Sequence, residues 1–274
     1  FDSKSIYTIH SWTFNEPHPG WQQSFRKKLS RLICRFYDLI IIPSDNDRMA
    51  ALEYGIAPKD KLKLIPTGID PGDGPPLDRD EARTKLLTPE ARDCIVIGTV
   101  AEFTKNKGLR FLLEAFASCR RTFRDRDPRR GAALHLILIG WGEEYAALRK
   151  KAEQLKIEND VTFVTNAVPA SPYLAAFDMF VLPSLHEGLH YALLEAGLAS
   201  LPVVATDVNG TADIIKHGKT GLLAPVANPA KLAAGMERLL ANPEFARGLG
   251  RNLREHIIKN FSLSEMLSKT FAAY

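Results

Sequence analysis

The segment that organises this sequence is Ser184–Glu195, which reads Ser-Leu-His-Glu-Gly-Leu-His-Tyr-Ala-Leu-Leu-Glu and sets two carboxylates eight residues apart among mostly apolar or small side chains. An apolar run, Phe177–Pro183, precedes it, and a second run, Leu201–Ala205, follows it. Between the runs, Ala192–Ala199 has helical composition. Strand, loop, helix and strand in this order form the right-handed crossover unit of a parallel sheet. The segment therefore predicts an α/β fold.

The two carboxylates of this segment are placed to meet a ligand. Glu187 falls in the loop at the carboxyl end of a strand, and Glu195 lies on the next helix beside a stripe of Tyr191, Leu194 and Leu198. Open parallel sheets bind ligands outside the strand carboxyl ends, where helix N-termini also attract phosphates. Taken singly, Glu195 could be a helix carboxylate paired with a lysine or a backbone N–H, and Glu187 an ordinary loop charge. Together they predict acceptors for the hydroxyl groups of a ligand.

Length, composition and charge exclude several classes of protein. A chain of 274 residues with 45% hydrophobic content can bury a large core, and a net charge of +4 does not indicate a nucleic-acid partner. Cys34, Cys94 and Cys119 are too widely spaced to suggest disulfides or zinc, which favours a reducing cytoplasm. No run approaches the ~20 apolar residues that a membrane-spanning helix needs, and the opening residues do not resemble a signal peptide.

The chain divides into a short leading half and a longer second half. The leading half predicts strands at 6–9, 39–43 and 62–66 with a helix at 45–54, and the Gly/Pro-rich residues 71–76 form a connection. We expect domains at 1–76 and 77–258, and a C-terminal helix, 259–274, that crosses back to the first domain. Because the strand at 6–9 looks internal and no Met precedes it, we also expect further sequence in front of it.

The second half alternates strands and helices in the manner of a doubly wound sheet. Residues 214–223 are interpreted as a short helix and a turn, and 244–274 as a helical tail. The other strands are expected at 94–100, 134–139 and 161–164, and the other helices at 109–121, 144–155, 171–176 and 229–240.

Three further groups follow strands of the second half and would share one edge of the sheet. Lys107 precedes a helix and could neutralise a diphosphate, although a lone Lys-Gly pair is usually a solvated turn. Gly140 and Gly142 flank Trp141 in a tight turn that lacks the third glycine of a dinucleotide fingerprint. Asp213 follows another strand, and helix capping explains it as well as ligand binding does.

The leading half offers His10 and a basic segment. His10 ends the first strand and could hydrogen-bond a substrate or a departing phosphate, although a histidine beside two aromatic residues is often simply packed. Residues 21–37 carry five basic and several apolar side chains that separate onto two helix faces. This pattern is typical of a helix resting on anionic lipid, and equally of a charged face over a domain core. Pairs of aspartates occur at helix starts or connections, and we assign no metal.

A set of motifs runs in one order from residue 97 to residue 223. They are Ile97-Gly98-Thr99-Val100, Lys107-Gly108, Leu138-Ile139-Gly140-Trp141-Gly142, Phe180-Val181-Leu182-Pro183-Ser184, Glu187-Gly188-Leu189, Glu195-Ala196, Pro202-Val203-Val204-Ala205-Thr206 and His217-Gly218-Lys219-Thr220-Gly221-Leu222-Leu223. This set resembles the C-terminal domain of the retaining glycosyltransferases called group 1 or family 4. Glu187 and Glu195 reproduce the E-x7-E motif of that family. The resemblance implies the GT-B architecture, in which a doubly wound, Rossmann-like C-terminal domain faces an N-terminal Rossmann-like domain that is only partial here.

The resemblance also implies an activity. It implies a hexosyltransferase that moves a sugar from a nucleotide-diphosphate sugar to a lipid-linked, polysaccharide or other glycan acceptor with retention of configuration. Neither a metal nor another cofactor is implied. The resemblance implies a role in cell-envelope or polysaccharide biosynthesis, in the cytoplasm or at the inner face of the cell membrane.

Site residues follow from the same resemblance. Glu195 would hold the ribose of the donor, and Glu187 the hydroxyls of the transferred sugar. Lys107 and backbone N–H groups would bind the diphosphate, and His10 matches a histidine often found at this point of the family's leading domain. Catalysis is thus assigned to Glu187, Lys107 and His10, and nucleotide binding to Glu195, Gly188, Leu189, His190, Gly140, Gly142, Thr165 and Asn166.

The sequence departs from the family pattern in two ways. Glu102 stands where the family usually has Arg, and it would repel a diphosphate unless Lys105 or another cation offsets it. The leading half is also much shorter than the family's. Both departures favour an alternative, a non-catalytic or split donor-binding module that needs a partner chain for the acceptor half.

Overall fold

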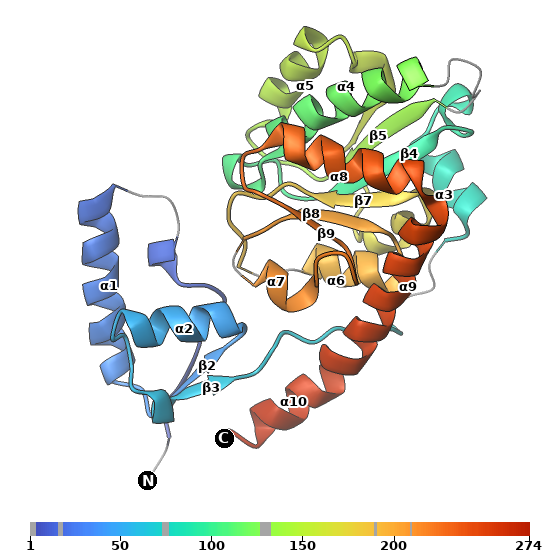
Figure 1. The fold of residues 1–274 in the computed structure, drawn as a ribbon. Helices are drawn as coiled ribbons and strands as arrows, with labels where there is room; N and C mark the ends of the chain where they lie inside the picture. The colour runs from blue at the N-terminus through green and yellow to red at the C-terminus, as the bar shows by residue number, and fades with distance from the viewer. Residues whose placement is uncertain (1–3, 16–18, 73–76, 127–132, 189–190, 209) are drawn as a thin grey trace.

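The computed structural model describes residues 4–15, 19–72, 77–126, 133–188, 191–208 and 210–274. It is an α/β protein with two parallel sheets, one of three strands and one of six. Figure 1 shows the small sheet with its helices beside the larger unit. The predicted fold class is confirmed. The division at residues 76 and 258 stays a prediction.

The larger sheet has the strand order β6-β5-β4-β7-β8-β9. Counted along the chain this is 3-2-1-4-5-6, the order of a dinucleotide-binding Rossmann sheet. All its neighbouring strands are parallel. The strands are β4 (Ile95–Val100), β5 (Leu134–Ile139), β6 (Val161–Val164), β7 (Met179–Leu182), β8 (Val203–Thr206) and β9 (Leu222–Ala224).

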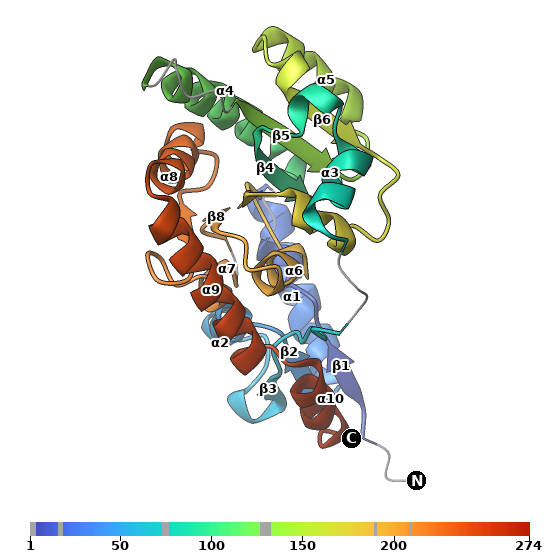
Figure 2. The ribbon, with the colours of Figure 1, turned by 90° about the vertical axis from the view of Figure 1, so that its right-hand side faces the viewer.

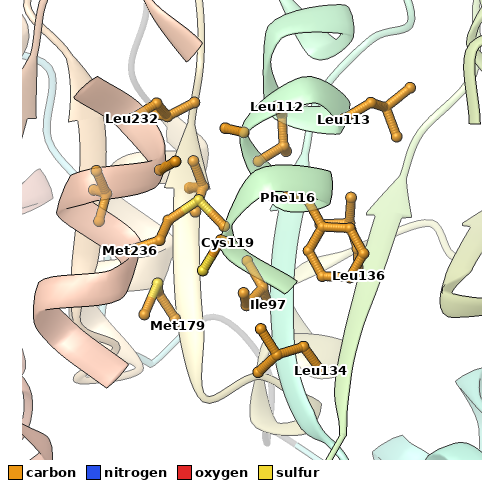
Figure 3. Close-up of a cluster of buried hydrophobic side chains, with 14 of the residues drawn as sticks. Ile97, Leu112, Leu113, Phe116, Cys119, Leu134, Leu136, Met179, Leu232 and Met236 are labelled. Atoms are coloured by element: carbon orange, nitrogen blue, oxygen red, sulfur yellow. The ribbon is translucent and has the colours of Figure 1, made fainter. Parts of the chain in front are cut away.

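Helices cover both faces of this sheet, so its strands are buried on both sides and their sequences are nearly continuous apolar runs. Helix α4 (Leu109–Arg126) places Leu112, Leu113 and Phe116 at helical spacing against strand residues such as Leu136 (Figure 3). The same face holds α5 (Tyr145–Gln154) and α8 (Pro229–Ala241), and the opposite face holds α3 (Arg79–Leu86) and α6 (Tyr191–Leu198). Helix α9 (Pro243–Asn260) contributes its first half to the one core and its second half to the other.

The small sheet consists of β1 (Ile6–Thr8), β2 (Leu39–Ile42) and β3 (Leu62–Leu64), in that order. Helix α1 (Gly20–Arg35) connects β1 to β2, and α2 (Asp45–Glu53) connects β2 to β3. Trp12 and Phe14 lie in the core of this unit, where the indole N–H of Trp12 donates to the Asp47 carbonyl at 2.8 Å.

The end of the chain packs against the small sheet. Helix α9 leads from the larger unit to α10 (Leu263–Phe271), which lies beside β2 and β3 in Figure 1 and Figure 2. Ala273 and Met266 contact Ile41 and Ile65. The Ile69 N–H donates to the Phe261 carbonyl at 2.8 Å, so the connection between the two sheets is held against the start of α10.

The structure differs from the predicted elements at three places. Residues 214–223 contain strand β9, which is only three residues long and is defined by its pairing with β8. Helix α7 (Thr211–Ile214) precedes it. The C-terminal tail is two helices because Ser262 caps a new one by accepting from the Glu265 N–H, whereas the helix at 171–176 has the predicted bounds and is of the 3-10 type. Helix α3 begins after the Asp78 cap and was not expected.

Candidate functional site

The centre of the candidate site is an ion pair between Lys107 and Glu187. The ammonium nitrogen lies 2.7 Å from a carboxylate oxygen, and the Glu187 side chain is only 3% exposed. Lys107 follows β4 and Glu187 follows β7, which are neighbours in the sheet although they are far apart in sequence. At this point the connections turn to opposite sides, and the carboxyl ends of such strands leave a crevice for ligands. The tertiary structure thus brings together two residues 80 positions apart.

Hydroxyl groups hold the buried carboxylate in place. The Ser184 hydroxyl donates to the second oxygen of Glu187, and the Thr206 hydroxyl donates to the Ser184 carbonyl. Ser184 is fully buried at the end of β7. A buried carboxylate costs free energy unless its oxygens are paired, and here each oxygen has a donor. Ser184 and Thr206 are not among the predicted site residues, and their signal in the sequence is a hydroxyl group at the carboxyl end of an apolar strand.

Glycines allow the loops at this edge to touch. Gly108 has a left-handed backbone, φ +62°, and a Cβ there would lie 2.2 Å from the Pro183 carbonyl oxygen. A Cβ on Gly140 would lie 1.8 Å from the Ala101 carbonyl oxygen, and one on Gly142 2.5 Å from that of Phe103. The glycine turn therefore packs backbone against backbone on the loop after β4. Trp141, between the two glycines, is 60% exposed.

Glu195 lines a cavity of about 350 Å³. It shares one face of α6 with Tyr191, one helical turn earlier, because residues four apart are neighbours on a helix. Burial raises the pKa of the Glu195 carboxyl. Within the residues that the structure describes, no hydrogen bond or ion pair joins this carboxylate to Lys107 or Glu187. The predicted convergence is shown directly for Lys107 with Glu187, and Glu195 opens on its own cavity.

The other wall of that cavity is the connection between the sheets. Gly68, Ile69, Asp70 and Pro71 line it together with Ser171 at the start of the 3-10 helix. The sequence predicts residues 71–76 only as a connection. No local signal in the sequence places it opposite Glu195, since residues 120 or more positions apart meet there only through the fold.

His10 lies at the interface between the two units. Its side chain is exposed, and its carbonyl oxygen would lie 3.2 Å from a Cβ on Gly188. The next residue, Ser11, has its hydroxyl 3.3 Å from the Nε2 of His186, which precedes Glu187. The segment after β1 therefore reaches the loop that carries Glu187, and the role of His10 stays a prediction.

The remaining predicted residues are placed as follows. Thr165 and Asn166 are exposed directly after β6, and Glu102 is exposed after β4. Asp213 is half-buried, and its carboxylate accepts from the Asp45 N–H of the small unit at 3.2 Å, so it joins the two units. Leu189 and His190 lie outside the described residues.

Among the described residues, no group of three or more His, Cys, Asp or Glu side chains is arranged to hold a metal ion. Cys34, Cys94 and Cys119 are not joined in disulfides.

Comparison with known families identifies the chain. A model described as "Glycosyl transferases group 1" matches residues 94–242, which include Lys107, Glu187 and Glu195. The chain belongs to the group 1 glycosyltransferases. A second model, "Glycosyltransferase Family 4", matches residues 1–73. Both units of the structure therefore have counterparts in this class of transferases.

Curated relatives have similar sequences over part of their length. A lipopolysaccharide core biosynthesis glycosyltransferase, LpsE, from Rhizobium meliloti (strain 1021) is 31% identical over 180 residues, 66% of this chain and 49% of the relative. N-acetyl-alpha-D-glucosaminyl L-malate synthase from Bacillus anthracis is 28% identical over 175 residues, 64% of this chain and 44% of the relative. In these matches the chain spans about half the length of the relative or less.

Solved structures of glycosyltransferases share the fold. Anabaena HepE in complex with UDP superimposes with a TM-score of 0.82 at 21% identity over 98% of this chain and 72% of that one. Sucrose-phosphate synthase from Thermosynechococcus elongatus gives a TM-score of 0.82 at 24% identity over 100% of this chain and 69% of that one. The two sheets thus have the GT-B arrangement.

Proposed function

We propose that this chain carries the donor site of a glycosyltransferase that moves a sugar from a nucleotide-diphosphate sugar to a glycan or lipid-linked acceptor, with retention of configuration. The observation that carries the proposal is the Lys107–Glu187 pair at the junction of β4 and β7, and Glu195 on the helix that follows lines a cavity of its own. The cation of Lys107 suits a diphosphate, and the carboxylate of Glu187 can bind the hydroxyls of a hexose. The carboxylate of Glu195 can bind a ribose. The Anabaena relative was solved with UDP, UDP and glucose, and UDP-glucose, which supports a nucleotide-sugar donor.

Each group has a chemical role in this proposal. The ribose hydroxyls donate to Glu195, and the sugar hydroxyls donate to the lone pairs of Glu187 that Ser184 and Lys107 leave unused. Lys107 faces the diphosphate together with the backbone of Gly188. Thr165, Asn166 and the Gly140 turn border the nucleotide. His10, on the opposite unit, faces the acceptor and the departing phosphate.

The reaction is driven by stabilisation of the leaving group. The bond between the anomeric carbon and the diphosphate oxygen breaks, and a bond forms from that carbon to the acceptor hydroxyl oxygen on the same face. The acceptor proton passes to the departing phosphate oxygen. Negative charge grows on the diphosphate during this step, and fixed donors that meet it lower the barrier. Since the positive charge of the Lys107 ammonium offsets this negative charge, the proposal requires no metal.

The alternative of a donor-binding module without its acceptor half is not favoured. The chain matches a glycosyltransferase family model in its leading half as well as in its second half. His10 of the leading half also lies against the Glu187 loop.

Replacing Glu195 with alanine should weaken nucleotide-sugar binding by about 10- to 100-fold, because hydrogen bonds to a charged group contribute about 1.5–3 kcal/mol. Thermal unfolding with a panel of UDP- and GDP-sugars measures this, since a ligand at about 100 times its Kd stabilises the fold by about 2.7 kcal/mol. Glu153→Ala, which removes an exposed carboxylate from α5, is the matched control and should keep the full shift. A wild-type chain that no nucleotide sugar stabilises would contradict the proposal.

Donor affinity should also depend on pH. Burial raises the pKa of Glu195, and ribose hydroxyls bind its ionised form, so affinity should fall as the pH is lowered through that raised pKa. Glu195→Gln should bind weakly at every pH and flatten the curve. Calorimetric titration of the same nucleotide sugar between about pH 5 and 8 measures the slope. An unchanged slope in Glu195→Gln would assign the pH dependence to another group.

A further inference from the structure

The carboxylate of Asp213 reaches from the larger unit to the first turn of helix α2 in the small unit. It accepts from the Asp45 N–H at 3.2 Å. Asp45 is the first residue of α2, and a helix has no acceptor of its own for this N–H. Ser44 accepts from the Asp47 N–H at 3.0 Å, so acceptors from both units cap the same helix end. The helix dipole adds to the attraction, because its N-terminus is positive.

This position is unfavourable for a carboxylate in other respects. Burial raises the pKa of the Asp213 carboxyl; the Asp45 N–H acts against this rise, and the Asp45 carboxylate adds to it. A half-buried carboxylate beside a second one contributes little to the stability of the fold. What the contact fixes is the position of α2 relative to the larger unit.

The first turn of α2 also holds the segment that follows β1. The indole N–H of Trp12 donates to the Asp47 carbonyl at 2.8 Å, and the Trp12 side chain is buried. Trp12 is two residues after His10, with Ser11 between them. The contact of Asp213 and the segment of His10 are therefore attached to the same helical turn.

The same segment meets the loop that carries Glu187. The Ser11 hydroxyl lies 3.3 Å from the Nε2 of His186, and a Cβ on Gly188 would lie 3.1 Å from the Cβ of Ser11. Gly188 and Asp213 both line a narrow cavity of about 30 Å³ between the units. The contacts at Asp213 and at Ser11 thus lie near one another and are connected through α2.

We propose that Asp213 is a positioning residue for the transfer reaction: by capping α2 from the other unit, it holds the His10–Ser11 segment against the loop of Glu187. This inference rests on the proposed function, in which His10 faces the departing phosphate and Glu187 the sugar. Asp213 acts only through α2 and Trp12. Since the donor groups are assigned to the larger unit, loss of the contact should lower the rate of reaction and leave donor affinity unchanged.

Cross-linking measures the position of the segment without any need for activity. Ser11→Cys/Gly188→Cys places two Cβ atoms 3.1 Å apart, and a disulfide spans about 3.5–4.5 Å between them. Under a mild oxidant this pair should close rapidly. Adding Asp213→Ala should slow closure about tenfold, the effect of one hydrogen bond that involves a charged group. Asp213→Asn keeps an acceptor oxygen and should restore most of the rate.

A matched pair of variants removes the donor instead of the acceptor. Asp45→Pro lacks the N–H, and proline is well tolerated at the first position of a helix after an extended residue such as Ser44. Asp45→Ala keeps the N–H and loses the same charge, together with an exposed ion pair to Arg48. Asp45→Pro should slow the cross-link as Asp213→Ala does, and Asp45→Ala should not. The double variant Asp45→Pro/Asp213→Ala should be no slower than either single one, because both remove one contact.

Kinetics separates positioning from donor binding. With UDP-glucose as the probe, Asp213→Ala should lower kcat for donor hydrolysis about tenfold and leave the calorimetric Kd and the melting temperature unchanged. Cross-linking or kcat that Asp213→Ala does not change would overturn the proposal. So would a weaker Kd, which would place Asp213 in the donor site. A chain that binds no nucleotide sugar but whose cross-link depends on Asp213 would contradict the proposed function and keep the role of Asp213 in positioning the segment.

Discussion

Replacing Lys107 with methionine should lower kcat/KM for a nucleotide sugar by about 10²–10³, because loss of one donor to a developing anion has effects of this size. Lys107 lies 2.7 Å from Glu187 in the unliganded site, where it is already oriented toward the crevice. The same change leaves the buried Glu187 carboxylate without its cation, which should cost stability, by about 3 kcal/mol. Steady-state hydrolysis of the donor and thermal unfolding measure the two effects.

Two variants separate the chemical effect from the structural one. Lys107→Met/Glu187→Gln has no buried charge left, so it should recover most of the lost stability and none of the activity. Lys150→Met changes an exposed lysine of α5 and should leave both quantities nearly unchanged. Full activity in Lys107→Met would remove this lysine from the reaction.

Replacing Gly140 with alanine should destabilise the fold by several kcal/mol. The added Cβ would lie 1.8 Å from the Ala101 carbonyl oxygen, and the backbone there has φ +150°, which side chains rarely adopt. Backbone atoms on both sides prevent an easy adjustment, so the cost exceeds the 1–3 kcal/mol of a tolerated clash. Urea denaturation measures the change.

Gly248→Ala is the matched control. Gly248 lies in α9 with open space around its Cβ position. Alanine has the higher helix propensity, so this variant should be stabilised by about 0.5–1 kcal/mol. Equal effects at the two glycines would contradict the view that the Gly140 turn is fixed by contact with the loop after β4.

The strands of the larger sheet could be predicted because they are buried on both faces. Residues 134–139 and 161–164 were predicted with the bounds that the structure has. Strand β9 was missed because three residues carry no measurable period, and pairing with β8 defines it. The start of α10 was not predicted at Leu263, because the apolar spacing continues past Phe261. The Ser262 cap begins the new helix there.

Within the candidate site, the residue types and their order along the chain were visible, and their contacts were not. The sequence placed Lys107 and Glu187 after strands, yet only the order of strands in the sheet makes those strands neighbours. It supplied the amphipathic pattern of α1 but not which side would face the protein. That side depends on Tyr54 and Gly55, which bind the cations of the helix from a distant loop.

The sequence by itself determined the family, the alternation of strands and helices, and the order of the residues that we propose to bind a sugar nucleotide, because burial and spacing are recorded locally in side-chain type. The tertiary structure alone decided that Lys107 pairs with Glu187, that Glu195 shares a cavity with the connection between the sheets, and that the apolar face of α1 points outward. Such contacts join residues many positions apart, and their free energies depend on three-dimensional packing that no local pattern encodes.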